Sequence, residues 1–455
     1  MTRARCIRRS PFDAQRRAAA LAVAAAAAAF ASAPWATGCG TGTAAAGGAG
    51  ARPRDRSKLY TDELPDGGGH VAMGDRARGD DGSLLLRARE VHPDPAVLAL
   101  VPLGPRPGWA ADLDAARVKL RDLERTLMES PRRYDLNALT SPADSNLDLL
   151  LGATGPELSP FTAVRAGPGG KELYLLRPPT AADDAWRRAD KAFAAGELGV
   201  ARAALDEVLK AAPDLPRALV LLGEIAERAD KDLPKAVALY RRAAAANPVD
   251  SEAHRLLADA LLATGDAAGA REEVMRALLY QPANVLAWAR LSALEKGAEV
   301  ASPRFDPAVR VELRPSGAIE VGYLDADDSF AVPYALCKAA MRYEPALWED
   351  VTGLHGPYVR SAMEEEHCVR LVLAAYLDAR AAADAKSGDG HAIPYLEHML
   401  AIEKAGMLRQ FVLFDVIGTR APHRVALLPD EEQARILEYL RKFATHAPGG
   451  RGTDI

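Results

Sequence analysis

The sequence has few cysteines, few aromatic residues and no large excess of charge of one sign. Of 455 residues, four are Cys, 6% are aromatic and 26% are charged, and the formal net charge is −5. This ordinary composition excludes a polytopic membrane protein, and the uncharged, Ala-rich run 18–33 is shorter than the roughly 20 residues that a transmembrane helix needs. The hydrophobic share of 49% is ordinary for a globular chain and excludes a collagen-like or wholly disordered protein.

Motifs that carry common chemistries are also missing. The sequence contains no HExxH, no G-x-S-x-G, no Walker loop and no Rossmann glycine pattern, so no cofactor is expected. Basic residues cluster only in residues 1–38, which contain six Arg and a single acid, Asp13. The rest of the chain carries a net negative charge. Because nucleic-acid binders need a basic stripe, we expect no nucleic-acid partner.

The N-terminus reads as a targeting segment. A basic stretch to Arg17 precedes the uncharged, Ala-rich run 18–33, which is typical of a secretory signal peptide. Cleavage after Ala33 is one alternative. The other is the sequence Ala-Thr-Gly-Cys at 36–39, which resembles a bacterial lipobox, although Ala36 stands where that family prefers Leu. The resemblance implies a signal peptide over 1–38, a lipid on Cys39 and, from composition, a flexible tether over 39–82 that anchors the protein to a membrane.

Two cysteines remain in the body of the chain. Cys337 and Cys368 are 31 residues apart, and an exported protein would meet an oxidising compartment. The sequence leaves open a disulfide between them or two small buried thiols.

The regions 83–179 and 302–445 read as small α+β domains. Each contains two alternating apolar segments around a Gly turn, at 161–176 and 309–323, which predict β-hairpins. Apolar stripes predict helices over 112–129, 332–343, 357–385, 392–405, 407–418 and 430–444.

The central region repeats itself. Small and turn residues recur at intervals of 35 and 34 residues, namely Ala201, Ala236 and Ala270, and Pro213, Pro248 and Pro282. Each period holds two helical stripes around a turn, and the second period has one extra turn residue. Helix pairs of this length resemble the tetratricopeptide repeat family. The resemblance covers 182–297 and implies three repeats followed by a capping helix near Trp288.

The same resemblance implies a concave groove that is lined by the first helix of each repeat and binds a peptide. By register, the groove residues are Trp186, Asp190, Phe193, Val220, Glu224, Glu227, Arg255, Asp259 and Leu262. The Lys and Asn clamp that one subclass uses for C-terminal carboxylates is replaced by Asp190, Glu224 and Asp259. An acidic track would favour a basic or amphipathic protein segment. The alternative is that these acids only solvate an exposed face and that Trp186 and Phe193 belong to the core.

One group of residues resembles a metal site more than any other in the sequence. It contains Glu364, Glu366, His367, His391, Glu397 and His398, which adjacent helices could bring together around zinc. No two of them stand four residues apart with ligand character on one face, so polar helix surface is the favoured interpretation and no metal is expected.

The sequence therefore predicts a mainly α protein in which a tetratricopeptide array is flanked by small α+β regions with β-hairpins. The predicted function is an exported, lipid-anchored scaffold for protein–protein interaction in the bacterial envelope, without catalysis. The alternative is a periplasmic metal-dependent hydrolase with its site in 302–445, and a third hypothesis is a spacer without a specific partner.

Overall fold

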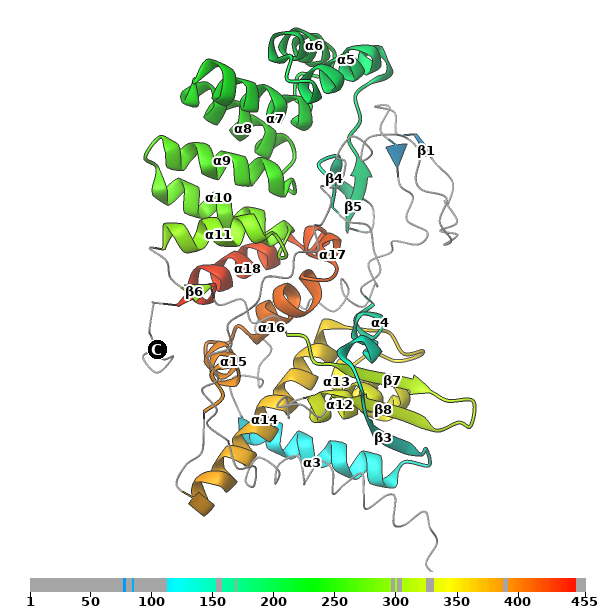
Figure 1. Ribbon diagram of the computed structural model, residues 1–455. Helices are drawn as coiled ribbons and strands as arrows, with labels where there is room; N and C mark the ends of the chain where they lie inside the picture. Colours follow the sequence, from blue (N-terminus) through cyan, green and yellow to red (C-terminus); the bar gives the residue numbers. More distant parts are fainter. Residues whose placement is uncertain are drawn as a thin grey trace, which may run out of the picture.

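The computed structural model describes residues 77–78, 84–85, 113–152, 158–167, 170–295, 299–300, 305–324, 331–387 and 392–446. This part of the chain is mainly α with a few short strands, which confirms the predicted fold class. Figure 1 shows a stack of helices above a small sheet that is covered by further helices. The predicted signal peptide, Cys39 and most of the predicted tether lie outside the described residues. Ala77 and Arg78, at the end of the predicted tether, differ from the prediction because they pair with Leu84 and Leu85 as strands.

Seven helices form the stack. They are α5 (Asp183–Ala194), α6 (Leu198–Ala211), α7 (Pro216–Ile225), α8 (Leu233–Ala246), α9 (Ser251–Ala263), α10 (Ala267–Tyr280) and α11 (Val285–Leu294). The three recurring alanines Ala201, Ala236 and Ala270 are fully buried. A side chain of one carbon lets neighbouring helix axes approach closely, which explains why these positions repeat.

The extra residue of the second repeat changes the geometry of one turn. Helix α7 continues into a π-helical turn, η4 (Ala226–Asp230), and Lys231 then takes the left-handed conformation with φ 56°. Such a wide turn absorbs one inserted residue without displacing the helix that follows. The spacing of Ala236 is therefore kept.

The segment before the array and the segment after it share one sheet. Strand β3 (Tyr134–Ala138) pairs in parallel with β8 (Ile319–Tyr323), which pairs antiparallel with β7 (Val309–Leu313). In addition, α3 (Leu113–Glu129) packs on the C-terminal helix α14 (Ala362–Ser387). The structure thus differs from the expected division at 83–179 and 302–445, because residues 113–152 belong to the same unit as 305–443 and the array is inserted between them.

The β7–β8 hairpin forms where the sequence predicts it, but only β7 has the expected alternation. Val309 and Val311 are buried on either side of the half-buried Arg310, whereas every residue of β8 from Ile319 to Gly322 is buried. Helix α12 (Ala331–Tyr343) packs on this apolar face.

The outer edge of β7 is closed by side chains of the N-terminal segment. Asn146 Nδ2 donates to the carbonyl of Val311, and Asn146 Oδ1 accepts from the amide of the same residue. Ser145 Oγ donates to the carbonyl of Val309. These bonds satisfy an edge that would otherwise be open to another strand.

The second predicted hairpin is β4 (Thr162–Gly167) with β5 (Gly170–Leu175), and β5 also pairs with β2 (Leu84–Leu85), which pairs with β1 (Ala77–Arg78). This hairpin lies beside the array (Figure 1). Asn247, at the end of α8, donates to the carbonyl of Thr162 at 2.9 Å. The hairpin is thereby tied to the loop between the second and third repeats.

The remaining helices lie on both sides of the array in the sequence. Before it lies α4 (Leu147–Leu151), and after it lie α13 (Pro345–Thr352), α15 (Pro394–Lys404), α16 (Leu408–Phe411), η5 (Val412–Gly418), α17 (Pro422–Leu427) and α18 (Asp430–Phe443). The predicted helix over 407–418 is α16 followed by the π-helical η5. Helices α4, α13 and α17 were not predicted. Strands β6 (Glu299–Val300) and β9 (Thr445–His446) form a further short pair.

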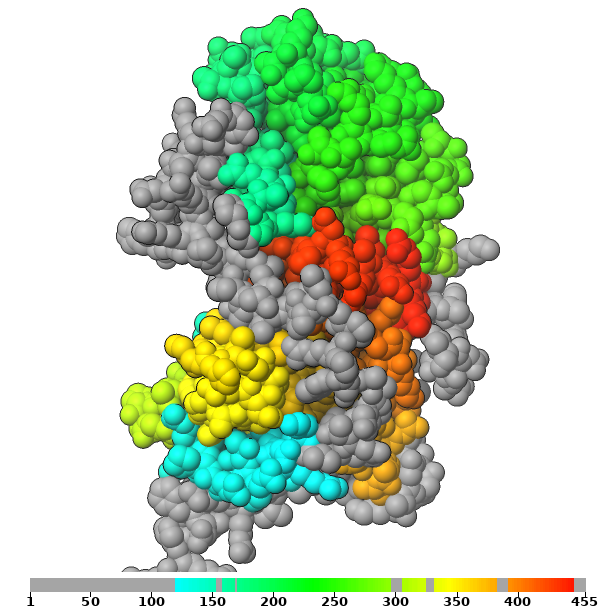
Figure 2. All heavy atoms as spheres, turned by 180° about the vertical axis from the view of Figure 1, so that it is seen from behind, coloured from blue at the N-terminus to red at the C-terminus, as the bar shows by residue number. Residues whose placement is uncertain are grey.

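The end of the array and the C-terminal helices form one packed body. Helix α18 runs antiparallel to α10, with Arg441 paired to Glu272 at 2.6 Å and Tyr280 donating to Gln433 at 3.0 Å. In Figure 2 the red surface of α18 lies directly beneath the green surface of the array. One hydrophobic core extends from α3 through α8–α11 to α18, whereas α5 and α6 share a smaller separate core with one face of α7.

Within the described part of the chain, none of the helices combines the length and the apolar character that spanning a bilayer requires.

Candidate functional site

The first helices of the repeats, α5, α7, α9 and α11, share one polar face. Arg217 on α7 pairs with Glu252 on α9 at 2.9 Å, and Asp259 on α9 pairs with Arg290 on α11 at 2.5 Å. Side chains that reach one another across three successive helices must lie on the face that these helices have in common. In a stacked array of helix pairs, the first helices line the inner surface.

The three acids of the predicted track lie on these helices. Asp190 is half-buried, Glu224 is 7% exposed, and Asp259 is half-buried. Burial raises the pKa of Asp190 and of Glu224, while neighbouring arginines, Arg217 for both and Arg228 for Glu224, oppose the shift. The carboxylates are therefore held in a partly desolvated surface.

Arginines interleave with these acids, so the row is not a track of free negative charge. Arg228 pairs with Glu224 at 2.8 Å, and Arg255 pairs with Asp259 at 3.1 Å, each one helical turn away. Our expectation of an acidic track overlooked these partners. The sequence does contain the signal, because residues four apart face each other on a helix.

The apolar groove candidates are placed differently from one another. Trp186, Phe193 and Leu262 are half-buried and pack against the cores of the array. Val220 is fully buried, so it contributes no surface to a groove. Glu227 accepts a hydrogen bond from the hydroxyl of Tyr240 at 3.0 Å, which engages it within its own repeat.

Aromatic residues from outside the array meet both of its ends. Trp186 on α5 contacts Phe161, just before β4, edge to face at 6.0 Å between ring centroids. Trp288 on α11 contacts Phe414 of η5 at 6.4 Å, also edge to face. The part of the inner face that is left between these contacts is the row on α7 and α9.

The histidine and glutamate group of 302–445 is dispersed. Glu366 lies 3.5 Å from Arg370 and 3.6 Å from Arg409, and Glu397 accepts from Tyr376 at 2.6 Å. His391 lies outside the described residues. Among the residues that the structure describes, no group of three or more His, Cys, Asp and Glu side chains could hold a metal ion.

The two described histidines of that group have different surroundings. His367 is 2% exposed, and burial together with the nearby Lys119 and Arg370 lowers its pKa to about 4, so its ring is neutral at physiological pH. His398 contacts the ring of Phe443 edge to face at 5.8 Å. Glu364 takes part in a different cluster.

That cluster joins α12 to α14 in the core and was missed in the sequence. Lys338 is 1% exposed and pairs with both Glu364 and Glu365, which are 0% and 3% exposed. The hydroxyl of Tyr334 donates to Glu365 at 2.7 Å, and the hydroxyl of Tyr358 donates to Glu364 at 3.0 Å. A lysine and two glutamates in helices normally indicate solvated faces, so the pattern alone gave no reason to place them inside.

The two cysteines of the body form a disulfide. Cys337 on α12 and Cys368 on α14 are bonded and both fully buried. The bond lies next to the Lys338 cluster in sequence, because Lys338 follows Cys337 directly.

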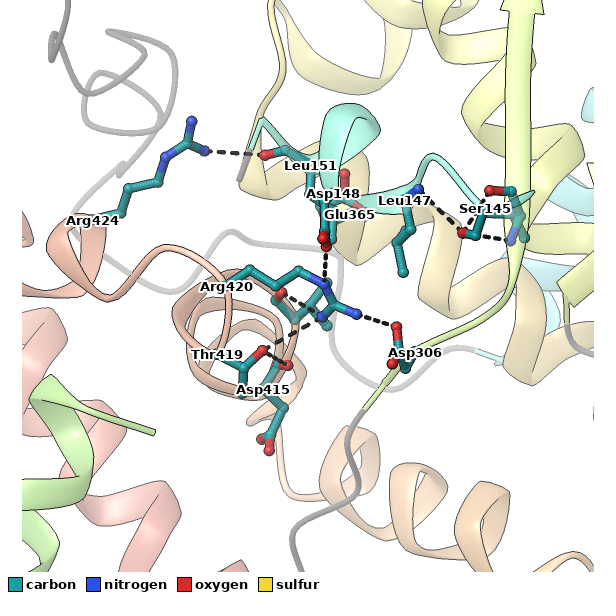
Figure 3. Close-up of polar contacts among 12 residues, drawn as sticks. Ser145, Leu147, Asp148, Leu151, Asp306, Glu365, Asp415, Thr419, Arg420 and Arg424 are labelled. Carbon is teal, nitrogen blue, oxygen red and sulfur yellow. Dashed lines mark hydrogen bonds and ion pairs between the residues drawn. The ribbon is translucent and has the colours of Figure 1, made fainter. Parts of the chain in front are cut away.

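Two arginines tie the C-terminal helices to the N-terminal segment (Figure 3). Arg420, only 7% exposed at its side chain, donates to Asp148 at 3.0 Å and to Asp306 at 2.6 Å. Arg424 donates to the carbonyl of Gly152 at 2.9 Å. These contacts fix the position of η5 and α17, and hence of the array that packs on them.

An open pocket of about 380 Å³ lies between α10 and α18. Its lining includes Tyr280, Leu279 and Leu437, with Arg276 and Arg441 among its polar members. Arg441 is already paired to Glu272.

Comparison with protein families agrees with the helical geometry. Two family models described as tetratricopeptide repeat match residues 187–248 and 227–294. A comparison with curated proteins finds no match. The matched residues span the helices from α5 to α11, with their repeated alanines and their common polar face. This segment of the chain is therefore a tetratricopeptide-repeat array.

Proposed function

We propose that the protein is a scaffold for protein–protein interaction that holds a partner on the inner face of its tetratricopeptide array. The observation that carries the proposal is the row of half-buried polar side chains on α7 and α9, which successive first helices share. Repeats of this family generally bind other proteins or peptides, and the array here is mounted on a rigid α+β unit.

The pairing of charges along this face bears on the partner. Arg217, Arg255 and Arg290 alternate with Glu252 and Asp259, so the face offers both signs in a fixed order. Partly exposed ion pairs are worth little in isolation, so exchanging them for pairs with a partner costs little. A protein segment with charges of both signs and an apolar residue for Leu262 fits this face better than a purely basic one.

The interaction is tested by capture from envelope extract, followed by binding of the captured partner to variants. Asp190→Asn with Asp259→Asn removes two carboxylates without introducing like charges, and we expect at least a tenfold loss of affinity. The control is Asp206→Asn with Glu207→Gln, two exposed carboxylates on the outer helix α6. Equal binding by both variants would contradict the proposal.

Reversal of all three acids to Lys is not a clean test. Glu224 is 7% exposed and paired to Arg228, so a lysine there would place two cations together in a desolvated position. The neutral substitutions avoid this. Higher salt should weaken wild-type binding, since charges at the rim act over about 8–10 Å.

We also propose that the chain is exported and anchored through a lipid on Cys39. The support is the signal-like N-terminus and the lipobox-like residues 36–39. A buried disulfide in the body suits an oxidising compartment. Cys39→Ser should move the protein from the membrane fraction to the soluble fraction, whereas Cys6→Ser should leave its distribution unchanged. A membrane-bound Cys39→Ser protein would contradict the anchor.

A further inference from the structure

The disulfide and the buried charges occupy the same contact between two helices. Glu364 and Glu365 precede Cys368 by four and three residues on α14, and Tyr334 precedes Cys337 and Lys338 by three and four on α12. Residues three or four apart lie on one helix face. The bond and the charges therefore form a single layer between α12 and α14.

Burial of the charged side chains makes this layer unfavourable unless its ion pairs are kept. Lys338 and Glu364 are essentially inaccessible to water, and removing an ion from water costs several kcal/mol even after relaxation. The attraction between the lysine and the glutamates offsets that cost only while their geometry is kept. If the helices part and water enters, each charge regains its hydration.

The layer also carries unequal charge. One ammonium faces two carboxyl groups, so a fully ionised cluster has an excess negative charge in the core. Burial raises the pKa of Glu364 to about 7, with Lys338 opposing the shift and Glu365 adding to it. When both carboxyl groups are ionised they repel each other, which favours separation of the helices.

We propose that the Cys337–Cys368 bond is a redox lock that keeps this charged layer closed, so that its loss opens α12 from α14 while the first repeat of the tetratricopeptide array, α5 and α6, stays folded. The array contains no cysteine between α5 and α11, and its ion pairs are partly exposed. The protein would then have one lobe that depends on an oxidising compartment and one that does not.

The chemical step is ordinary thiol–disulfide exchange. A dithiol reductant gives up two electrons and two protons and becomes a cyclic disulfide, and the sulfur–sulfur bond of Cys337 and Cys368 becomes two thiols. Because both sulfurs are buried, the reductant reaches the bond only when α12 and α14 separate transiently. Removal of the bond by mutation avoids this kinetic barrier.

The test uses four forms of the full chain and hydrogen exchange read by mass spectrometry in α12 and α14 and, for comparison, in α5 and α6. The first form is wild type, and the second lacks the bond through Cys337→Ala with Cys368→Ala. The third carries the neutral cluster, Lys338→Met with Glu364→Gln and Glu365→Gln. The fourth combines all five substitutions. The neutral set keeps side-chain size and leaves acceptors for Tyr334 and Tyr358.

We expect loss of the bond to speed exchange in α12 and α14 by about 100-fold or more with the native cluster, and by less than about tenfold with the neutral cluster. Exchange in α5 and α6, which share the separate smaller core, should change little in either case. The effect of the bond on unfolded-chain entropy acts equally in both backgrounds and cancels in the comparison. An equal increase in both backgrounds, or none with the native cluster, would overturn the inference.

A control variant and a variant with a single substitution test whether the effect depends on this cluster. Arg370→Met with Glu403→Gln neutralises another ion pair of α14, whose atoms lie 2.6 Å apart, and should not suppress the effect of the bond. Should the triple neutral set fail to fold, Glu364→Gln alone removes the excess charge and should reduce the increase several-fold. No reduction with Glu364→Gln would also count against the lock.

Discussion

At the scale of single residues, close contacts explain why a particular residue type occupies a position, which composition alone does not. Gly223 on α7 faces Tyr240 on α8, and a Cβ at this glycine would lie 2.5 Å from Cε1 of the tyrosine ring. The ring is fully buried, and its hydroxyl is held by Glu227. A glycine at this position of α7 is thus required by the packing of an aromatic ring.

Gly223→Ala should lower the free energy of unfolding by about 1–3 kcal/mol, because the ring has little room to move. Gly199 on α6 is the matched control, since nothing lies within 4 Å of the Cβ that it would gain. Gly199→Ala should be neutral or stabilise by up to about 1 kcal/mol through helix propensity. Urea unfolding measures both, and equal effects would mean that the contact with Tyr240 is not limiting.

A second residue makes stability depend on pH. Asp415 in η5 is 1% exposed, and burial raises its pKa from 3.8 to about 8, although the hydroxyl of Tyr439 donates to it at 2.5 Å. The folded chain therefore keeps a proton that the unfolded chain releases near pH 4. The stability that this proton provides is complete below about pH 4 and is lost as the pH rises through 8.

Asp415→Asn should flatten the fall in unfolding free energy between pH 5 and pH 8. One retained proton contributes a slope of at most about 1.4 kcal/mol per pH unit, so the variant should gain on the order of 2 kcal/mol at pH 8 relative to pH 5. Tyr439 can still donate to the amide oxygen. Parallel pH profiles for variant and wild type would show that Asp415 is ionised in the fold.

At the scale of elements, local sequence patterns predicted the helices and hairpins, whereas the pairing of segments far apart in the sequence was not predicted. The helix pairs of the array follow from recurring Ala and Pro, and both hairpins follow from alternation around a glycine turn. The parallel pairing of β3 with β8 spans the whole array, and a strand of five residues has too short a pattern to identify so distant a partner. Short helices such as α13 and α17 lack enough turns to show a period.

The candidate sites could likewise be predicted where they depend on local sequence, but not where they depend on how two helices pack. The acids on the first helices were found from register, whereas Arg228 and Arg290 were overlooked because only one sign of charge was sought. The Lys338 cluster was missed because its burial depends on how α12 meets α14. Charges in a helix look alike in sequence whether they face water or each other.

Ala270→Glu tests the helix contact on which the repeat register depends. Ala270 on α10 is fully buried, so a carboxylate there would be left in a packed contact without a partner. We expect a cost of several kcal/mol and loss of a cooperative melting transition in circular dichroism. Ala268→Glu on the same helix is exposed and should melt like wild type. A normal melting curve for Ala270→Glu would mean that the register is wrong.

At the scale of the whole molecule, the two hydrophobic cores divide the array unequally. Helices α9 and α10 belong to the large core that includes α18, while α5 and α6 depend on the small core with one face of α7. The first repeat should therefore open more readily than the third. The third repeat should respond to changes in the C-terminal helices that leave the first repeat unaffected.

Gln433→Ala should show this division. Gln433 on α18 is buried, accepts from Tyr280 of α10, and donates to the carbonyls of Val425, Ala426 and Leu428 at 3.0–3.2 Å. Its loss removes this donor from the carbonyls of Ala426 and Leu428 and this acceptor from the hydroxyl of Tyr280, which costs about 1–3 kcal/mol. Hydrogen exchange should accelerate in α10, α17 and α18 and stay at wild-type rates in α5 and α6, where exchange is already faster. Arg435→Ala, an exposed change on the same helix, should alter none of these rates. Uniform acceleration across all repeats would instead indicate that the array and the C-terminal helices unfold as one unit.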